Sequence, residues 1–327
     1  MPIARINGFE NLPDDLRGGV VAIGNFDGVH LGHQAVLNSA LNGKASGPSI
    51  ALTFEPHPRQ FFKPDTPLAR ITPAPQKAEV IAAIGFDAVV EQPFTRAFSK
   101  LTAEAFVTEV LIKGLGASHV VTGFDFHFGA KRGGGPAFMM EAGKRHQFGV
   151  TLVDAFRDEQ AEVISSSRIR EALIEGNINA ANMLLGYHHF ASATVTGGKQ
   201  LGRTLGYPTA NMALAPDTPL AHGIYAVRFY RADGSILDGV ASFGRRPTVD
   251  EDGAPLLETF IFDFDDDLYG ENCRVSFIEY LRGEEKFDGL DALKTQMDAD
   301  AAAARDMLAK CKPLSALDTE LTFGGAG

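Results

Sequence analysis

The ten residues from Gly24 to His33 constrain the fold more than any other stretch of the chain. They follow the apolar run Val20–Ile23 and precede the helix-like segment Gln34–Leu41. This order predicts a buried strand, a glycine-rich turn and a helix. Because unpaired N–H groups and the positive dipole end gather at a helix N-terminus, the turn suits a phosphate. His30 and His33 are one helical turn apart, so both can face one ligand.

The same turn does not continue into the Gly-Lys-Ser/Thr of a Walker motif. Its ending His-Leu-Gly-His resembles the HxGH signature of nucleotidyltransferases, which attack the α-phosphate of ATP. Helix capping alone would explain the two histidines, but the surrounding Gly-Asn-Phe-Asp-Gly favours a nucleotide site. We therefore expect nucleotide contacts from the turn, at Gly24, Asn25, Asp27 and Gly32.

Residues 1–185 alternate between short apolar runs and helix-like segments. The candidate strands are Val20–Ile23, Ser49–Thr53, Ala88–Val90, His119–Thr122 and Thr151–Val153, and the candidate helices include Gln76–Ile84 and Ala103–Ile112. This alternation predicts an α/β, Rossmann-like domain, in which helices cover both faces of a parallel sheet. Ligands of such sheets bind beyond the carboxyl ends of the strands. The Gly24–His33 turn, Phe54–Pro58 and Gly123–Gly135 all fall at such ends.

Two further segments of this half could contact a nucleotide. Asp125 lies between Phe124 and Phe126, and such a group could stack on and hydrogen-bond a planar ring, although alternating core phenylalanines give the same pattern. Ser165, Ser166 and Arg168 stand at the start of a helix-like segment. Capping explains one serine, whereas a serine run followed by arginine also suits phosphate.

Residues 186–327 show a different sequence pattern. Short runs rich in Val, Phe, Tyr and Ile are broken by Gly, Pro and Asp: Phe190–Gly197, Gly223–Tyr230, Ile236–Phe243, Glu258–Phe264 and Cys273–Leu281. They predict a mainly antiparallel β-barrel domain with a C-terminal helix over Leu290–Ala309. The expected buried stripe of that helix is Leu290, Leu293, Met297, Ala304 and Met307. The glycine-ending tail, Leu321–Gly327, is expected to be mobile.

The second half carries its own candidate site in the string from Gly198 to Asn211. Gly202 and Gly206 would let the backbone approach a phosphate closely. Thr209 and Asn211 are two apart, so in an extended segment both can offer an oxygen to one hard cation. Glu258 opens an apolar run and could be a general base or a solvated edge charge.

The composition of the chain limits which partners and which cellular compartment are expected. The net charge of −11 argues against duplex DNA or an anionic membrane as the main partner, because both require a positive field. Two cysteines, Cys273 and Cys311, cannot build a disulfide scaffold and predict free thiols in a reducing compartment. No apolar run reaches transmembrane length. We expect a cytoplasmic protein, and the sequence carries no signal for its oligomeric state.

These strings together resemble the bifunctional riboflavin kinase/FAD synthetase family of bacteria. The resemblance covers nearly the whole chain and rests on Gly24–His33, Phe54–Pro58, Gly123–Gly129, Ile164–Arg170, Gly202–Asn211, Gly223–Val227, Ala241–Val249, Glu258–Gly270 and Leu281–Leu293. It implies an FMN adenylyltransferase domain over residues 1–185 and a riboflavin kinase barrel over residues 186–327. The implied small-molecule ligands are ATP, riboflavin, FMN and FAD, and the implied cofactor is Mg²⁺ bound with ATP.

The resemblance also implies a role for each site residue. His30, His33, Ser165, Ser166 and Arg168 would contact ATP phosphates. In the kinase half, Thr209 and Asn211 would hold Mg²⁺, Glu258 would be the base, and Arg282 would lie in a flap over the flavin. The chain departs from the family at Ser167, His127 and Asp250; His127 stands where arginine is frequent. Loss of adenylylation through His127, or a flavin-binding protein without turnover, are the alternatives.

Overall fold

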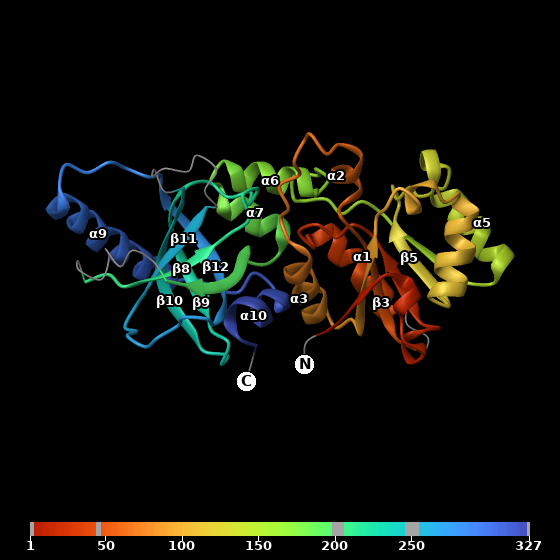
Figure 1. Cartoon of the computed structure of the whole chain (residues 1–327), viewed down its shortest axis with the longest axis horizontal. Coiled ribbons are helices and arrows are strands. Elements are labelled where there is room, and N and C mark those ends of the chain that lie inside the picture. Colours follow the sequence, from red (N-terminus) through yellow and green to blue (C-terminus); the bar gives the residue numbers. More distant parts are fainter. Residues whose placement is uncertain (1–2, 44–46, 198–205, 246–254, 326–327) are drawn as a thin grey trace. The chain divides into compact units, whose positions relative to one another are not determined.

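The structure is a computed structural model that describes residues 3–43, 47–197, 206–245 and 255–325 (Figure 1). The chain divides into two compact units, Met1–Ser166 (unit 1) and Ser167–Gly327 (unit 2). The predicted domain boundary at residues 185/186 stays a prediction.

Unit 1 is built on a six-stranded sheet in the order β1-β4-β3-β2-β5-β6, and all its neighbouring strands are parallel. The strands are β1 Ala4–Asn7, β2 Val20–Ile23, β3 Ser49–Glu55, β4 Ala88–Pro93, β5 His119–Gly123 and β6 Gly149–Val153. The predicted α/β class and all five candidate strands are confirmed. Strand β1 was missed because it is a short, mostly exposed edge strand with no apolar run.

Helices flank this sheet. They are α1 Leu31–Asn42, α2 Pro58–Phe62, α3 Ala74–Ile84, α4 Ala103–Ala105 and α5 Pro136–His146, with the short 3₁₀ helices η1 Phe9–Asn11, η2 Asp14–Leu16, η3 Phe98–Lys100 and η5 Ala130–Arg132. The next helix along the chain is α6, Ser166–Ile174. The single helix expected over 103–112 is instead a turn of α-helix followed by the π-helix η4, Phe106–Gly114. Helix α6 begins at the last residue of unit 1.

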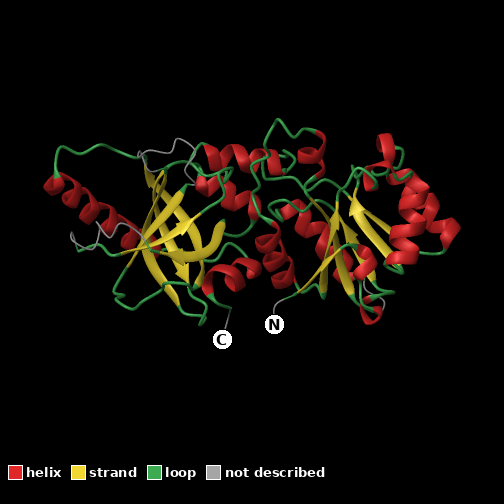
Figure 2. Cartoon of the chain, in the orientation of Figure 1, coloured by secondary structure: helices red, strands yellow, loops and turns green. Residues whose placement is uncertain are grey.

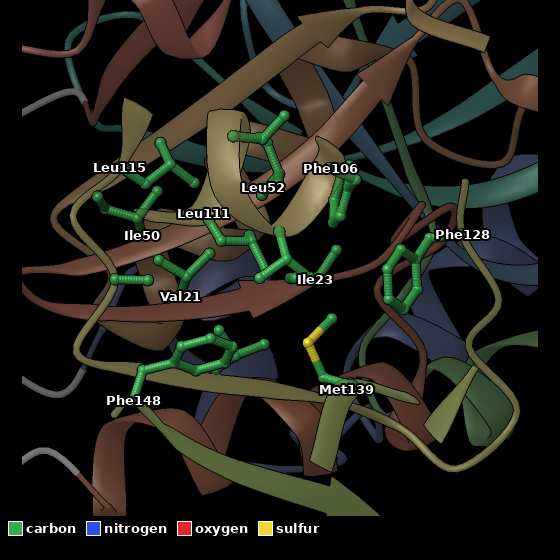
Figure 3. Packing of buried hydrophobic residues seen from close by; sticks show 14 of the residues in the cluster. Val21, Ile23, Ile50, Leu52, Phe106, Leu111, Leu115, Phe128, Met139 and Phe148 are labelled. Atoms are coloured by element: carbon green, nitrogen blue, oxygen red, sulfur yellow. The ribbon is translucent and has the colours of Figure 1, made fainter. Parts of the chain in front are cut away.

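The core of unit 1 explains why β2 is a continuous apolar run and why β3 is mostly apolar. Val21 and Ile23 of β2 and Ile50 and Leu52 of β3 pack with Leu111 of η4 (Figure 3). These strands lie inside a parallel sheet, where side chains are buried on both faces. Burial of both faces leaves the polar chemistry to the loops at the strand ends.

Unit 2 is a closed barrel in the order β10-β11-β8-β7-β12-β9, with antiparallel neighbours (Figure 2). The strands are β7 Phe190–Thr196, β8 Thr209–Ala213, β9 Gly223–Tyr230, β10 Ile236–Gly244, β11 Leu256–Ile261 and β12 Asn272–Arg282. The predicted antiparallel barrel is confirmed. The strand expected over 258–264 ends at Ile261, before a turn in which Asp263 has a positive φ of 55°.

Among the described residues of unit 2, the helices besides α6 are α7 Ile178–Leu185, α9 Leu290–Leu308 and α10 Ala316–Phe323. Helix α9 confirms the predicted C-terminal helix and packs against β9, β10 and β12. Among the described residues, no helix is both long and apolar enough to cross a membrane.

The predicted buried stripe of α9 is partly wrong. Leu290 is 65% exposed and Met307 39% exposed, whereas Asp300, Ala304 and Leu308 are buried. The carboxylate of Asp300 lies on the buried face of α9, and a search for apolar residues at helical spacing could not predict it.

The expectation of a mobile tail from Leu321 is wrong for residues 321–323. They form the end of α10, and Leu321 is 3% exposed. The Ser315 hydroxyl caps the first turn of that helix by accepting from the N–H of Asp318. The cap and the buried apolar side chain together hold this helix in place.

Candidate functional site

The first candidate site lies at the carboxyl edge of the unit 1 sheet. Strand β2 has β3 on one side and β5 on the other, and all three run in the same direction. Their last residues, Ile23, Glu55 and Gly123, therefore end at one edge of the sheet. The Gly24–His33 turn leads from this edge into α1, as the sequence predicts. A crevice where the chain departs to both sides of one strand is the usual ligand position in such sheets.

The two histidines of the turn lie against each other. His30 is the N-cap of α1, and its Nδ1 accepts a hydrogen bond of 3.3 Å from the His33 N–H. The two rings are stacked with centroids 3.7 Å apart. A side chain at Gly32 would come within 3.2 Å of the His30 ring, so glycine leaves room for it. Capping is thus part of the role of His30, and it fixes both rings at the start of α1.

Burial sets the charge state of His33. Desolvation, followed by the nearby His30, Lys77 and His57, lowers the pKa of His33 well below its usual 6.5. Its Nδ1 is buried and has no hydrogen-bond partner within the part of the chain that the structure describes. His33 is therefore neutral at neutral pH, with one N–H donor and one acceptor nitrogen.

The backbone of the turn is strained at two positions. Phe26 and Val29 have positive φ angles of 50° and 37°, which residues other than glycine seldom adopt. The Phe26 ring folds back so closely that a Cβ at Gly24 would lie 2.8 Å from it. Such strain costs roughly 1–3 kcal/mol per residue and concentrates at functional sites. The surrounding contacts must therefore hold the turn in place.

Asp27 supplies several of those contacts. Its side chain is 1% exposed, and Oδ1 accepts from the backbone N–H groups of Ile71 and Thr72, each at 3.1 Å. The Asp27 carbonyl also accepts a 2.8 Å hydrogen bond from the Ser166 hydroxyl. This bond brings the predicted serine segment to the Gly24–His33 turn. These contacts assign Asp27 a positioning role, and its predicted contact with nucleotide stays a prediction.

A buried ion network beside the turn was not found from the sequence. The Lys77 Nζ, with its side chain fully buried, contacts Glu55 Oε1 and Thr53 Oγ1 at 2.8 Å and the Asn25 carbonyl at 3.3 Å. Arg70 forms a bidentate pair with Glu55, both bonds 2.9 Å. Burial opposes the charge of Glu55, but Arg70 and Lys77 outweigh it and lower its pKa to about 2. Only the position of Glu55 at a strand end signalled it in the sequence.

The other segments at this edge have mixed roles. His57 caps α2 by accepting from the Arg59 N–H at 3.1 Å, which is a structural role. Asp125 is exposed, and its carbonyl lies 2.7 Å from His127 Nδ1. Phe128 belongs to the core, but Phe124 is 47% exposed. The interpretation of Phe124, Phe126 and Phe128 as alternating core residues therefore holds for Phe128, and for Phe126, which packs against the core, but fails for Phe124.

The second candidate site lies on two neighbouring barrel strands. Asn211 of β8 is directly opposite Glu258 of β11, and Thr209 is opposite Phe260. Opposed residues in an antiparallel pair have Cβ atoms about 5 Å apart. All four side chains share one face, because the alternate residues Met212 and Leu257 are fully buried on the other. The structure thus brings Thr209, Asn211 and Glu258 together.

A pocket of about 500 Å³ adjoins this face, between β11 and α9. Gly206, Tyr207, Phe260 and Asp298 contribute to its lining. The Tyr207 hydroxyl donates to Asp298; burial and this carboxylate raise the pKa of Tyr207 to about 12. Phe260 is two residues from Glu258 on the same strand face, so the pocket and the predicted base are neighbours.

Arg282 ends β12 and is tied to α9. Its guanidinium pairs with Asp300, with the shortest contact 2.7 Å, and Gln296 donates to the same carboxylate at 2.9 Å. The ion pair explains how Asp300 can be buried. The predicted flap role of Arg282 stays a prediction. Gly202 and Asp250 lie outside the described residues.

Comparisons with known proteins agree with both halves. The FAD synthetase family model matches residues 12–168, and the riboflavin kinase model matches residues 185–308. Bifunctional riboflavin kinase/FMN adenylyltransferases of Pseudomonas fluorescens and Escherichia coli K12 are 40% and 37% identical, over 93% and 94% of this chain and 97% and 99% of theirs.

A similar fold has been solved by crystallography. A chain described as a macrolide-efflux protein from Streptococcus pneumoniae matches with a TM-score of 0.80 and 30% identity, over 94% of this chain and 99% of that one. The family resemblance drawn from the sequence is confirmed by the matched models and relatives. The chain belongs to the bifunctional riboflavin kinase/FMN adenylyltransferase family, the enzymes that make FMN and FAD.

Proposed function

We propose that Glu258, Thr209 and Asn211 carry the riboflavin kinase reaction, and that His30 and His33 carry the adenylylation of FMN. The observation behind this proposal is that each set lies together within a unit of its own. The histidines are stacked at the start of α1, and Asn211 opposes Glu258 in the barrel. The expected cytoplasmic location belongs to the same proposal.

The kinase reaction needs a base. Its nucleophile is the ribityl 5′-hydroxyl of riboflavin, which is neutral and weakly nucleophilic at neutral pH. A carboxylate at Glu258 accepts the hydroxyl proton as the oxygen attacks the γ-phosphate of ATP. The pocket beside Phe260 provides room for a flat apolar ring next to this carboxylate.

The donor set beside Glu258 fits Mg²⁺ bound with ATP. Thr209 and Asn211 offer a hydroxyl and an amide oxygen, the hard ligands that this ion prefers. Among the described residues, no group of three or more His, Cys, Asp or Glu could hold a metal alone. Phosphate oxygens would therefore complete the coordination, and the ion would neutralise charge on the transferring phosphoryl group.

The adenylylation reaction needs donors and no base. The FMN phosphate has a second pKa of about 6, so it is already anionic at neutral pH. It must be aligned with the α-phosphate of ATP, and the leaving pyrophosphate must be stabilised. In this proposal His30, His33, Ser165 and the α1 N-terminus provide hydrogen-bond donors, while the Ser166 hydroxyl donates to the Asp27 carbonyl and helps to hold the turn. Arg168, in the first turn of α6, stays a predicted phosphate contact.

The experiment compares two variants of the full chain, Glu258→Gln and His30→Ala, incubated with ATP, Mg²⁺ and flavin and followed by flavin chromatography. We expect Glu258→Gln to stop FMN formation from riboflavin while it still converts supplied FMN to FAD. We expect His30→Ala to accumulate FMN and to make little FAD. Thermal unfolding of both variants checks that they are folded.

Either variant that stops both reactions while folded refutes the assignment of separate residues. Conversion of riboflavin to FMN alone by the unaltered protein would favour the alternative in which His127 weakens the first site. Bound riboflavin without turnover would favour a flavin-binding protein.

A further inference from the structure

A third cluster of reactive side chains lies in unit 2, among residues that neither reaction uses. His188, in the segment before β7, places Nδ1 at 2.8 and 3.0 Å from the two carboxylate oxygens of Asp318 in α10. On the other side of the ring, Nε2 is 3.7 Å from the Sγ of Cys311, which follows α9. The order thiol, imidazole, carboxylate is that of an activated nucleophile, its base and the group that orients the base.

Asp318 is held firmly enough to orient the imidazole. It is fully buried and also accepts from the backbone N–H groups of His188 and Leu314, both at 2.9 Å. Burial opposes charge on His188, but the hydrogen bonds and charges of Asp318 and Cys311 outweigh it and raise the pKa of His188 to about 9. The ring is therefore protonated at neutral pH. With Nδ1 bonded to Asp318, the Nε2 proton faces Cys311.

The two cysteines of the chain have opposite surroundings. Cys311 is partly exposed, and the exposed lysines Lys310 and Lys312 flank it in the sequence. Cys273 is 2% exposed, and burial, followed by Glu271, raises the pKa of its thiol to about 11. An imidazolium stabilises a neighbouring thiolate, whereas an apolar, acidic environment disfavours it. Cys273 therefore serves as an internal control for the reactivity of Cys311.

We propose that Cys311 is a modification site, an activated thiol that exchanges with small anionic disulfides. The thiolate form of the Cys311 sulfur attacks one sulfur of the reagent R–S–S–R and forms a mixed disulfide. The S–S bond of the reagent breaks, the second sulfur leaves as RS⁻, and His188 keeps its proton on Nε2. Cys311 is oxidised to Cys311–S–S–R as one RS group is reduced to RS⁻. Lys310 and Lys312 favour a reagent that carries carboxylates.

The test measures the rate of thiol exchange with 5,5′-dithiobis(2-nitrobenzoate) in the folded full chain. Cys273→Ser leaves only Cys311, and Cys311→Ser leaves only Cys273. We expect fast release of the coloured thiolate from the first and almost none from the second. His188→Asn, on the Cys273→Ser background, retains an N–H at the position that faces Asp318 and removes Nε2.

We expect His188→Asn to slow the exchange about fivefold. The variant removes the imidazolium beside the Cys311 sulfur, and a neighbouring cation favours attack by the thiolate. If His188 had only a structural role, His188→Asn would increase the exchange rate, because loosening α10 would expose the Cys311 thiol.

An unchanged or faster rate in folded His188→Asn overturns the proposal, and so does modification of Cys273 in place of Cys311. If His188→Asn does not fold, the exchange rate of Cys273→Ser with His188 in place still tests the proposal. Cys311 must then react faster than N-acetylcysteine at the same neutral pH, and an equal or slower rate overturns the proposal.

Discussion

Lys77→Met tests whether the buried ion network holds the nucleotide turn of unit 1. The Lys77 side chain is fully buried and joins Glu55, Thr53 and the Asn25 carbonyl. Methionine fills a similar volume but donates no hydrogen bond. The variant therefore leaves Glu55 with Arg70 as its remaining cation in the network.

The size of the effect follows from burial. Removal of one partner of a buried ion pair costs about 3–5 kcal/mol, because a charge is left without compensation. Glu55 retains the bidentate pair with Arg70 and is 24% exposed, so we expect the lower end, about 3 kcal/mol. In a domain of this size, each kcal/mol lowers Tm by about 2–4 °C. The unfolding transition of unit 1 should fall by about 6–12 °C.

Calorimetry of the full chain measures this shift, and Lys113→Met is the matched control. Lys113 is 67% exposed and pairs with Glu109 at 2.8 Å, one helical turn away. Such surface pairs contribute about 0.5 kcal/mol or less. We also expect Lys77→Met to slow FAD formation, because Asn25 belongs to the turn, and to leave FMN formation unchanged. A Tm equal to that of Lys113→Met, or unimpaired FAD formation, would refute this reasoning.

The same network predicts a pH dependence. The pKa of Glu55 falls from an ordinary 4.5 to about 2 in the folded state. A depressed carboxyl pKa stabilises the fold above 4.5, and this stability is lost as pH falls from 4.5 towards 2. Without Lys77 the pKa of Glu55 rises, so less stability depends on this carboxylate. Lys77→Met should therefore show a shallower acid-induced loss of Tm than the unaltered chain.

Three further predictions concern single sites. Chelation of divalent ions should stop FMN formation, and Asn211→Ala should raise the Mg²⁺ concentration that restores it. Gly24→Ala should slow FAD formation, because its Cβ would lie 2.8 Å from the Phe26 ring. The raised pKa of His188 stabilises unit 2 below pH 6.5 and loses this effect as pH rises through about 9; Asp318→Asn should flatten that dependence of Tm.

Sequence patterns predicted the elements whose burial is uniform or alternates simply. Strand β2 is buried on both faces and appears as an unbroken apolar run, and β3, also buried, is apolar except at Ser49, Thr53 and Glu55. Strand β1 is the edge strand beside β4 and is mostly exposed, so no apolar run marks it. In α9 the buried position 300 is an aspartate, because Arg282 compensates its charge from another element. An apolar stripe cannot reveal a compensated charge.

Site residues within one local motif could be predicted from the sequence, whereas contacts between distant elements could not. His30 and His33 belong to one local motif, and their stacking follows from helical spacing. The pairing of Asn211 with Glu258 depends on strand register across 47 positions, which local pattern does not give. Lys77 was missed because it lies on an ordinary helical segment while its partners come from β3 and the Gly24–His33 turn.

At the proposed phosphate site of unit 1, the donors of the Gly24–His33 turn and of the α1 N-terminus are neutral. The chain carries a net charge of −11, so its overall field repels ATP and FMN. The α1 N-terminus offers oriented N–H groups, and burial keeps His33 neutral. A neutral donor holds a ground-state phosphate less tightly than a cation does, and its hydrogen bond strengthens as charge develops on the leaving pyrophosphate. Such a difference between ground and transition state is what accelerates a reaction.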